Sequence, residues 1–208
     1  MKKTDSLTKV FRIIFILVIA VSAVIIFLNW DKITVDAIIN FTPNNYFLAF
    51  LVLLLLYILK SLSVFFPILV LQISTGIIFP TFWGIIVNMI CALAMVSTPY
   101  WVSRKLFPHS KDALFEKHPK IKVRIEKYNK NELLLSTILR LLGLLPIDVI
   151  SSLLGMMKVN YFKYAAGSLI GLAPGIVAST IMGSSISDPT SPQFIISIAS
   201  MTIITVIT

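Results

Sequence analysis

Residues 133–157 read LLLSTILRLLGLLPIDVISSLLGMM, an apolar run that contains Arg140, Gly143, Pro146 and Asp148. Its 25 residues are too few for two complete helical crossings of a bilayer, which need about 40. Proline lacks a backbone N–H and its ring clashes with the preceding helical turn, so we expect the helix to break at Pro146. In a membrane, the run therefore predicts a re-entrant helix–break–helix hairpin. Its broken backbone must be buried in protein or line a wet cavity.

The composition places this hairpin in an integral membrane protein. Apolar residues make up 57% of the 208 residues and charged residues 13%, against roughly 45–50% and 25% in soluble domains. The mean hydropathy is +0.94. A soluble globule of this size could not hide so much apolar surface, which excludes soluble enzymes, nucleic-acid-binding proteins and disordered chains. The lone Cys91 excludes an internal disulfide framework and a cysteine-based metal site.

Apolar runs and polar gaps divide the chain into three parts. Residues 1–45 are expected to hold an uncleaved N-terminal transmembrane helix, apolar from about Ile13 to Leu28, and an external loop. Residues 46–186 form the main domain, and residues 187–208 a C-terminal transmembrane helix. The main domain should contain, in order, a hairpin over 46–79, a span over 82–103, a basic loop over 104–132, a hairpin over 133–157 and a span over 161–186. The expected fold class is an all-α membrane protein with transmembrane helices and two inverted re-entrant hairpins.

The distribution of cations assigns these segments to the two sides of the membrane. Of 18 Lys and Arg residues, 15 lie in residues 1–12, in residues 104–130, and at Lys158 and Lys163. Because Lys and Arg are enriched in cytoplasmic loops, these regions and both termini are expected in the cytoplasm. The loops 31–45 and 187–193 hold one cation and three acids and should lie outside. With this orientation in a cell membrane, the first hairpin enters from the outer face and the second from the inner face.

The two hairpins share a sequence pattern. Residues 60–76 read KSLSVFFPILVLQISTG and residues 140–155 read RLLGLLPIDVISSLLG. In both, a cation precedes a proline by six or seven residues, and eight residues separate that proline from a glycine. Inverted repeats with broken helices near the membrane midplane are a transporter architecture, so the pattern favours a transporter.

The chain also resembles a known family. Residues 140–175, RLLGLLPIDVISSLLGMMKVNYFKYAAGSLIGLAPG, resemble the second half of the VTT domain of the DedA (SNARE-associated) membrane proteins. Residues 66–84, FPILVLQISTGIIFPTFWG, with the span that Arg104 closes, resemble its first half. Gly143, Ser151 and Pro80 stand where the family often has proline, asparagine and glycine. The resemblance implies a lipid flippase or scramblase that acts on undecaprenyl phosphate or a phospholipid and is often linked to the proton-motive force.

Arg140 is the strongest candidate for a substrate-binding residue. An arginine at the centre of a membrane helix costs about 2.5–3.5 kcal/mol on insertion scales, so it should face protein or water and have a partner. Its planar guanidinium suits a phosphate, whereas the alternative is an internal ion pair or a side chain that reaches the interface. Lys60, its counterpart in the first hairpin, is a second candidate for substrate binding or for snorkelling. Gly143, Pro146 and Pro67, at the breaks, complete the expected substrate-binding set.

Asp148 is the one acid within these apolar segments, and two roles remain open for it. Because the break at Pro146 could bring Asp148 close to Arg140, the carboxyl group could take up and release protons during transport. Alternatively, it forms a structural salt bridge with Arg140 or caps the second half-helix, since Asp is a favoured N-cap residue.

Other features predict packing and membrane contacts. Gly167, Gly171 and Gly175 form two successive GxxxG steps, which are typical of close helix packing. The loop 104–132 carries nine cations and four acids and is expected to lie on anionic lipid headgroups.

We expect no enzymatic activity, because His109 and His118 lie in that loop without a paired nucleophile. We also expect no cofactor or bound metal, and the apolar composition argues against a nucleic-acid partner. The substrate and the bilayer are then the main partners, and a homo-oligomer stays open. Two competing functions are a proton-coupled transporter of a small ion or drug, and a membrane scaffold that does not transport.

Overall fold

The computed structural model describes residues 17, 20–21, 24, 28–63, 66–107, 131–143 and 145–207, and its regular elements there are helices. They are a short 3-10 helix η1 (Trp30–Lys32), and α2 (Val35–Phe41), α3 (Tyr46–Ser61), α4 (Ile68–Ile78), α5 (Thr81–Leu106), α8 (Glu132–Leu141), α9 (Ile147–Met156), α10 (Tyr161–Ser184) and α11 (Pro192–Ile207). The all-α class is thus confirmed over this part of the chain. Most of the expected N-terminal helix and of the basic loop 104–132 lies outside the described residues.

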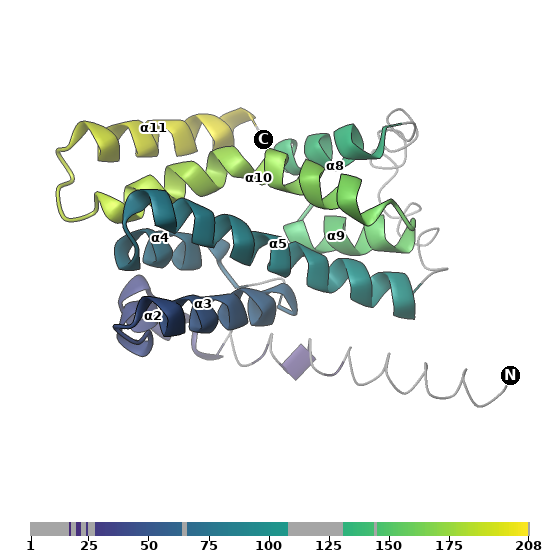
Figure 1. The fold of residues 1–208 in the computed structure, drawn as a ribbon, viewed down its shortest axis with the longest axis horizontal. Coiled ribbons are helices and arrows are strands. Elements are labelled where there is room, and N and C mark those ends of the chain that lie inside the picture. The colour runs from purple at the N-terminus through teal and green to yellow at the C-terminus, as the bar shows by residue number, and fades with distance from the viewer. Residues whose placement is uncertain are drawn as a thin grey trace, which may run out of the picture.

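Two long helices, α5 and α10, form the centre of the bundle (Figure 1). Over the described residues they are the two helices long and apolar enough to cross a membrane. They pack against each other, and the shorter helices cover them: α3 and α9 lie on α5, whereas α4, α8 and α11 lie on α10. Large apolar side chains such as Phe47, Leu55, Trp83, Phe162 and Ile196 remain exposed on the outside, as expected for a surface that faces lipid.

The shorter helices α3 and α4, and α8 and α9, form two helical hairpins that enter the bundle from opposite ends (Figure 1). α4 begins directly after Pro67 and α9 directly after Pro146, so each proline marks the start of the second helix of its hairpin. α8 and α9 have 10 residues each, or about 15 Å of helix, which is half of the ~30 Å hydrocarbon core. Re-entry into a membrane and an inverted repeat stay predictions.

The two glycines of the shared pattern make equivalent contacts. A Cβ added at Gly76 of α4 would lie 2.2 Å from the backbone oxygen of Thr180 in α10. A Cβ added at Gly155 of α9 would lie 2.2 Å from the backbone oxygen of Tyr100 in α5. Each hairpin therefore places its glycine against the long helix that follows the other hairpin. Only glycine permits this close an approach of two helix backbones.

The region of residues 31–45 differs from the expected external loop, because it contains η1 and α2. Thr34 begins α2 as an N-cap, with its Oγ1 accepting a hydrogen bond from the backbone N–H of Ala37 at 3.2 Å. Ile38 of this helix is buried and joins the hydrophobic core. The segment whose polar composition predicted a loop thus contains a short capped helix that packs against α4.

Candidate functional site

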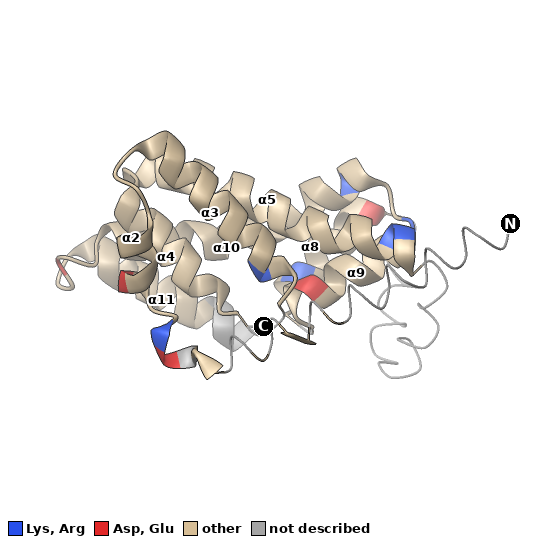
Figure 2. Cartoon of the chain, turned by 90° about the horizontal axis from the view of Figure 1, so that it is seen from below, with Lys and Arg blue, Asp and Glu red and all other residues tan. Residues whose placement is uncertain are grey.

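Three charged side chains lie buried where the two hairpins meet. Lys60, Arg140 and Asp148 have relative exposures of 5%, 6% and 4%. Figure 2 shows positive and negative residues together in the middle of the bundle, near the facing ends of α3, α8 and α9, while the other charged residues that the structure describes lie toward the two ends. We call these three residues the central cluster.

Helix ends position the members of the central cluster. Lys60 lies in the last turn of α3, and Arg140 in the last turn of α8. Asp148 lies in the first turn of α9, and Pro146 caps that helix without a side-chain hydrogen bond. Cations at a helix C-terminus and an anion at an N-terminus both compensate the helix dipole. The breaks therefore create the ends at which these charges are favourable.

Arg140 is held by neutral hydrogen-bond acceptors. Its Nη1 donates to the backbone oxygen of Ile147 at 2.6 Å, and its Nη2 donates to Ser151 Oγ at 2.7 Å and to Tyr164 Oη at 3.1 Å. Nε and Nη2 also donate to Ser168 Oγ, at 3.4 Å each. The guanidinium carbon lies 5.9 Å from the centre of the Tyr164 ring. These groups orient the guanidinium but do not neutralise its charge.

The acid of the central cluster pairs with the lysine and not with the arginine. Lys60 Nζ lies 2.5 Å from Asp148 Oδ2, and this ion pair joins α3 of the first hairpin to α9 of the second. Arg140 has no ion pair with a carboxylate of the described residues. With Lys60 and Arg140 charged and Asp148 ionised, the central cluster keeps a net charge of +1.

Two buried oxygen atoms near the hairpin turns are without a hydrogen-bond partner among the described residues. They are Asp148 Oδ1 and Ser63 Oγ, and Ser63 follows Lys60 in the turn between α3 and α4. Buried polar atoms without a partner are uncommon in folded proteins, because desolvation of a polar group has to be compensated. The central cluster therefore has unused hydrogen-bonding capacity at its acid.

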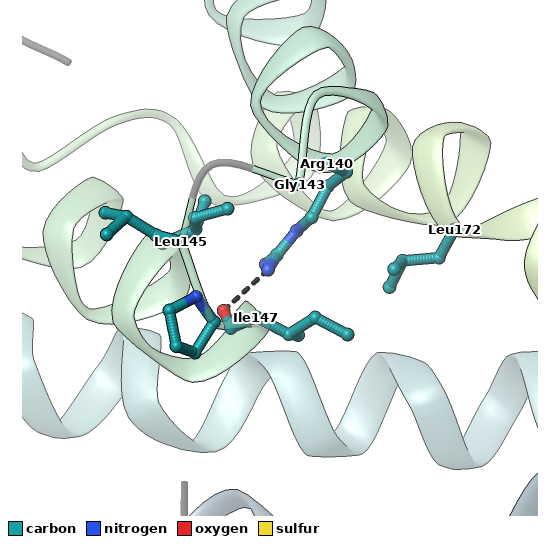
Figure 3. Close-up of a pocket in the computed structure, with 7 residues that line it drawn as sticks. Arg140, Gly143, Leu145, Ile147 and Leu172 are labelled. Carbon is teal, nitrogen blue, oxygen red and sulfur yellow. Dashed lines mark hydrogen bonds between the residues drawn. The ribbon is translucent and has the colours of Figure 1, made fainter. Parts of the chain in front are cut away.

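A cavity of about 500 Å³ adjoins Arg140. It is lined by Arg140, Gly143, Leu145, Pro146, Ile147, Ile150 and Leu172. Figure 3 shows the Arg140 side chain reaching past Gly143 to the Ile147 carbonyl, with Leu145 and Leu172 on either side. A single charged side chain thus lies in the wall of an otherwise apolar cavity, at the break between α8 and α9.

The structure gathers part of the substrate-binding set predicted from the sequence. Gly143 and Pro146 line the same cavity as Arg140, and Gly143 has a φ of 52°, a left-handed backbone that favours glycine just after a helix. Lys60 and Pro67 are not among the residues that line this cavity. Lys60 instead connects to the site through Asp148.

The three glycines expected to pack helices do not behave alike. Gly167 and Gly171 lie against α8, where an added Cβ would come within 2.3 Å of Leu133 O and 2.6 Å of Arg140 Cβ. Gly175 corrects the prediction, because an added Cβ would meet nothing within 4 Å. α8 ends at Leu141 beside Gly171, so α10 has no such close neighbour one turn further on.

Sequence reasoning missed the residues that hold the guanidinium. Tyr164 and Ser168 are four positions apart and share one face of α10, the spacing expected of neighbours on a helix. A polar pair at this spacing in an apolar span is a signal that could have identified them.

Sequence reasoning also missed a neutral buried network around Asn88. Its Nδ2 donates to Gln72 O and Thr180 Oγ1, and its Oδ1 accepts a hydrogen bond from Tyr57.

Comparison with known proteins gives one result. The family model of the VTT domain, the domain of DedA (SNARE-associated) proteins, matches residues 66–185. The match extends from the start of α4 to the end of α10 and includes Arg140 and Asp148. No curated protein and no solved structure matches the chain.

Proposed function

Since this chain belongs to the VTT domain family of DedA membrane proteins, we propose that it is a lipid flippase or scramblase. Its substrate is a lipid phosphate, such as undecaprenyl phosphate or a phospholipid, which it moves across the cytoplasmic membrane. One observation carries the proposal: Arg140 is buried in the wall of a cavity, and no carboxylate of the described residues pairs with it.

A buried charge without a counter-ion favours an anionic ligand. Transfer of an isolated charge out of water is very unfavourable, and buried charges are normally paired. The hydrogen bonds from Arg140 to Ile147, Ser151 and Tyr164 fix the orientation of its planar fork. A phosphate monoester or diester offers the oxygen geometry that such a fork binds best, and its negative charge would pair with the guanidinium.

The apolar lining suits a lipid better than a free anion. Leu145, Ile147, Ile150 and Leu172 line the cavity together with Arg140. A phosphate joined to a hydrocarbon chain would place its charge at Arg140 and its chain against these side chains. The start of α9 at the same cavity adds the partial positive charge of a helix N-terminus.

The proposal includes the arrangement in the membrane. The hairpins re-enter the bilayer from opposite faces as inverted repeats, which the equivalent contacts of Gly76 and Gly155 support. Of the charged described residues outside the central cluster, Arg104, Lys105, Glu132, Lys158 and Lys163 lie at one end and Asp31, Lys32, Asp36 and Asp188 at the other. The cation-rich end faces the cytoplasm under the positive-inside rule. The basic loop 104–132 then contacts anionic headgroups there.

A proton-coupled transporter of a small ion or drug is the second candidate. The buried Asp148, with its unpartnered Oδ1, is the observation that favours it. A membrane scaffold without transport is the third, and it would depend on the basic loop as a docking surface.

Reconstitution into liposomes tests the proposal. Liposomes that contain fluorescent phosphatidylglycerol, fluorescent undecaprenyl phosphate or a fluorescent neutral glycolipid are assayed for movement between leaflets by quenching from outside. We expect the purified protein to accelerate movement of at least one phosphate lipid and not that of the glycolipid. Acceleration of no phosphate lipid would contradict the proposal, and proton-driven uptake of a small solute instead would favour the second candidate. Transport that survives replacement of residues 110–129 would argue against the scaffold.

A further inference from the structure

Lys60, the second cation of the central cluster, is already paired with the carboxylate of Asp148. Lys60 Nζ carries three N–H donors, and Asp148 Oδ2, at 2.5 Å, is the partner that the described residues offer it. Arg140 donates to Ile147 and Lys60 to Asp148, so both cations contact consecutive residues in the first turn of α9. Arg140 and Asp148 also lie close enough for their charges to interact, so an anion bound at Arg140 would compete with this carboxylate for the cations of the central cluster.

From this geometry, and resting on the proposed function, we propose that Asp148 is a tethered stand-in for the substrate's phosphate. In the empty protein its carboxylate neutralises Lys60. When the lipid phosphate binds, a phosphate oxygen replaces Asp148 Oδ2 on Lys60, and the released carboxylate takes up one proton from water. Lys60 thereby becomes a second phosphate ligand beside Arg140, and anion binding is coupled to proton uptake.

The loss of its ion-pair partner favours protonation of Asp148, and the exchange leaves the net charge of the central cluster unchanged. Before binding, the cluster holds two cations and one carboxylate, for a net charge of +1. After binding of a singly charged phosphate and one proton, it holds two cations, one phosphate and a neutral acid, and the net charge is again +1. A carboxylate that lost Lys60 and stayed ionised would be a buried charge without an ion-pair partner, which costs far more than protonation.

The groups around Asp148 fit this exchange. The charged groups that interact with Asp148 are Lys60 from α3 and Arg140 from α8, and the phenol of Tyr164 from α10 accepts a hydrogen bond from Arg140. Phenols are neutral near pH 7, so they neither replace the carboxylate nor supply a competing anion. Asp148 Oδ1 has no hydrogen-bond partner among the described residues, so a proton can be accepted there without breaking another bond.

Calorimetry of the full chain in maltoside detergent tests the exchange. The probe is dihexanoyl phosphatidylglycerol, a phosphodiester whose single charge is constant near neutral pH. Binding heats near pH 7, measured in buffers with high and low ionisation enthalpy, give the number of protons taken up per anion bound. The variants are Asp148→Asn, whose amide oxygen can still accept from Lys60, and Glu132→Gln. The latter removes the acid of the exposed pair with Lys163 and is the matched control.

We expect the wild-type protein and Glu132→Gln to take up about one proton per bound anion. Asp148→Asn should take up none and bind the probe about tenfold more tightly, because the competing carboxylate is gone. The exchange would be overturned if the wild-type protein bound the probe without proton uptake, or if a monodisperse Asp148→Asn took up as many protons as the wild type. The proposed function would still stand in that case if Arg140→Gln abolished binding. A wild-type protein that binds no probe would overturn both.

Discussion

Lys60 and Arg140 carry the same charge, but the fold satisfies them differently. Lys60 depends on one carboxylate, Asp148, whereas Arg140 depends on a carbonyl, hydroxyl groups and a ring face. Removal of one partner of a buried ion pair strands the other charge, whereas removal of both is often tolerated. We therefore expect removal of both Lys60 and Asp148 to be tolerated better than removal of Lys60 alone.

The first prediction concerns stability. Lys60→Met alone should destabilise the protein by about 3–5 kcal/mol, because Asp148 loses its counter-ion. The double variant Lys60→Met with Asp148→Leu should recover most of that loss. Lys163→Met, at the exposed ion pair with Glu132, is the control and should cost at most about 1 kcal/mol. Thermal unfolding in detergent measures all three. A double variant as unstable as the single one would show that the ion pair is not an isolated unit.

At this scale, the sequence singled out the charged residues that the structure buries but not how they pair. Arg140, Asp148 and Lys60 are recognisable because charged residues are rare in apolar segments. The eight-residue separation of Arg140 and Asp148 left a local pair open, yet Asp148 pairs with Lys60, 88 positions away. Helical periodicity describes one helix, and a contact between two hairpins depends on how the helices pack.

At the scale of the element, prolines and glycines define the hairpins. Pro67 and Pro146 start α4 and α9, and Gly76 and Gly155 let these helices touch the long helices α10 and α5. The sequence placed helix breaks at these prolines, and α4 and α9 begin directly after them, since proline restricts the backbone locally. It could not predict which glycine packs, because Gly175 shares the GxxxG spacing but α8 ends before reaching it.

The second prediction compares a glycine that contacts another helix backbone with one that lies in open space. Gly155→Ala should destabilise the protein by about 1–3 kcal/mol, because its Cβ would overlap the backbone of Tyr100. Gly175→Ala, in open space, should be neutral or up to about 1 kcal/mol more stable, since alanine favours helix. Thermal unfolding of the two variants decides the matter. Equal loss of stability in both would refute the close contact of α9 with α5.

At the scale of the whole molecule, the proposed orientation in the membrane rests on the charges at the two ends. Arg104 donates to the carbonyl of Val159 at 3.0 Å, which places the end of α5 beside the start of α10. Lys158 lies in the same connection, whereas Asp188 lies beyond the far end of α10. α10 has 24 residues, or about 36 Å, which is enough to cross the ~30 Å core.

The third prediction tests this orientation with single cysteines in a Cys91→Ser background. Asp188→Cys should react with an impermeant thiol reagent added to intact cells, and Lys158→Cys should react only after the cells are opened. Positive-inside charge is the physical reason, because Lys158 belongs to the cation-rich end. External labelling of Lys158→Cys with protection of Asp188→Cys would invert the proposed topology.

The most direct test of the central claim measures phosphate-lipid transport by Arg140→Lys in liposomes. The variant keeps the charge but loses the planar fork that the Ile147 carbonyl, Ser151 and Tyr164 orient. Arg104→Lys is the matched control, since Arg104 lies outside the cavity and donates to the carbonyl of Val159. We predict that Arg140→Lys slows transport at least tenfold, a loss of about 1.4 kcal/mol or more, while Arg104→Lys transports at the wild-type rate. Wild-type transport by a well-folded Arg140→Lys would contradict the assignment of Arg140 as the phosphate-binding residue.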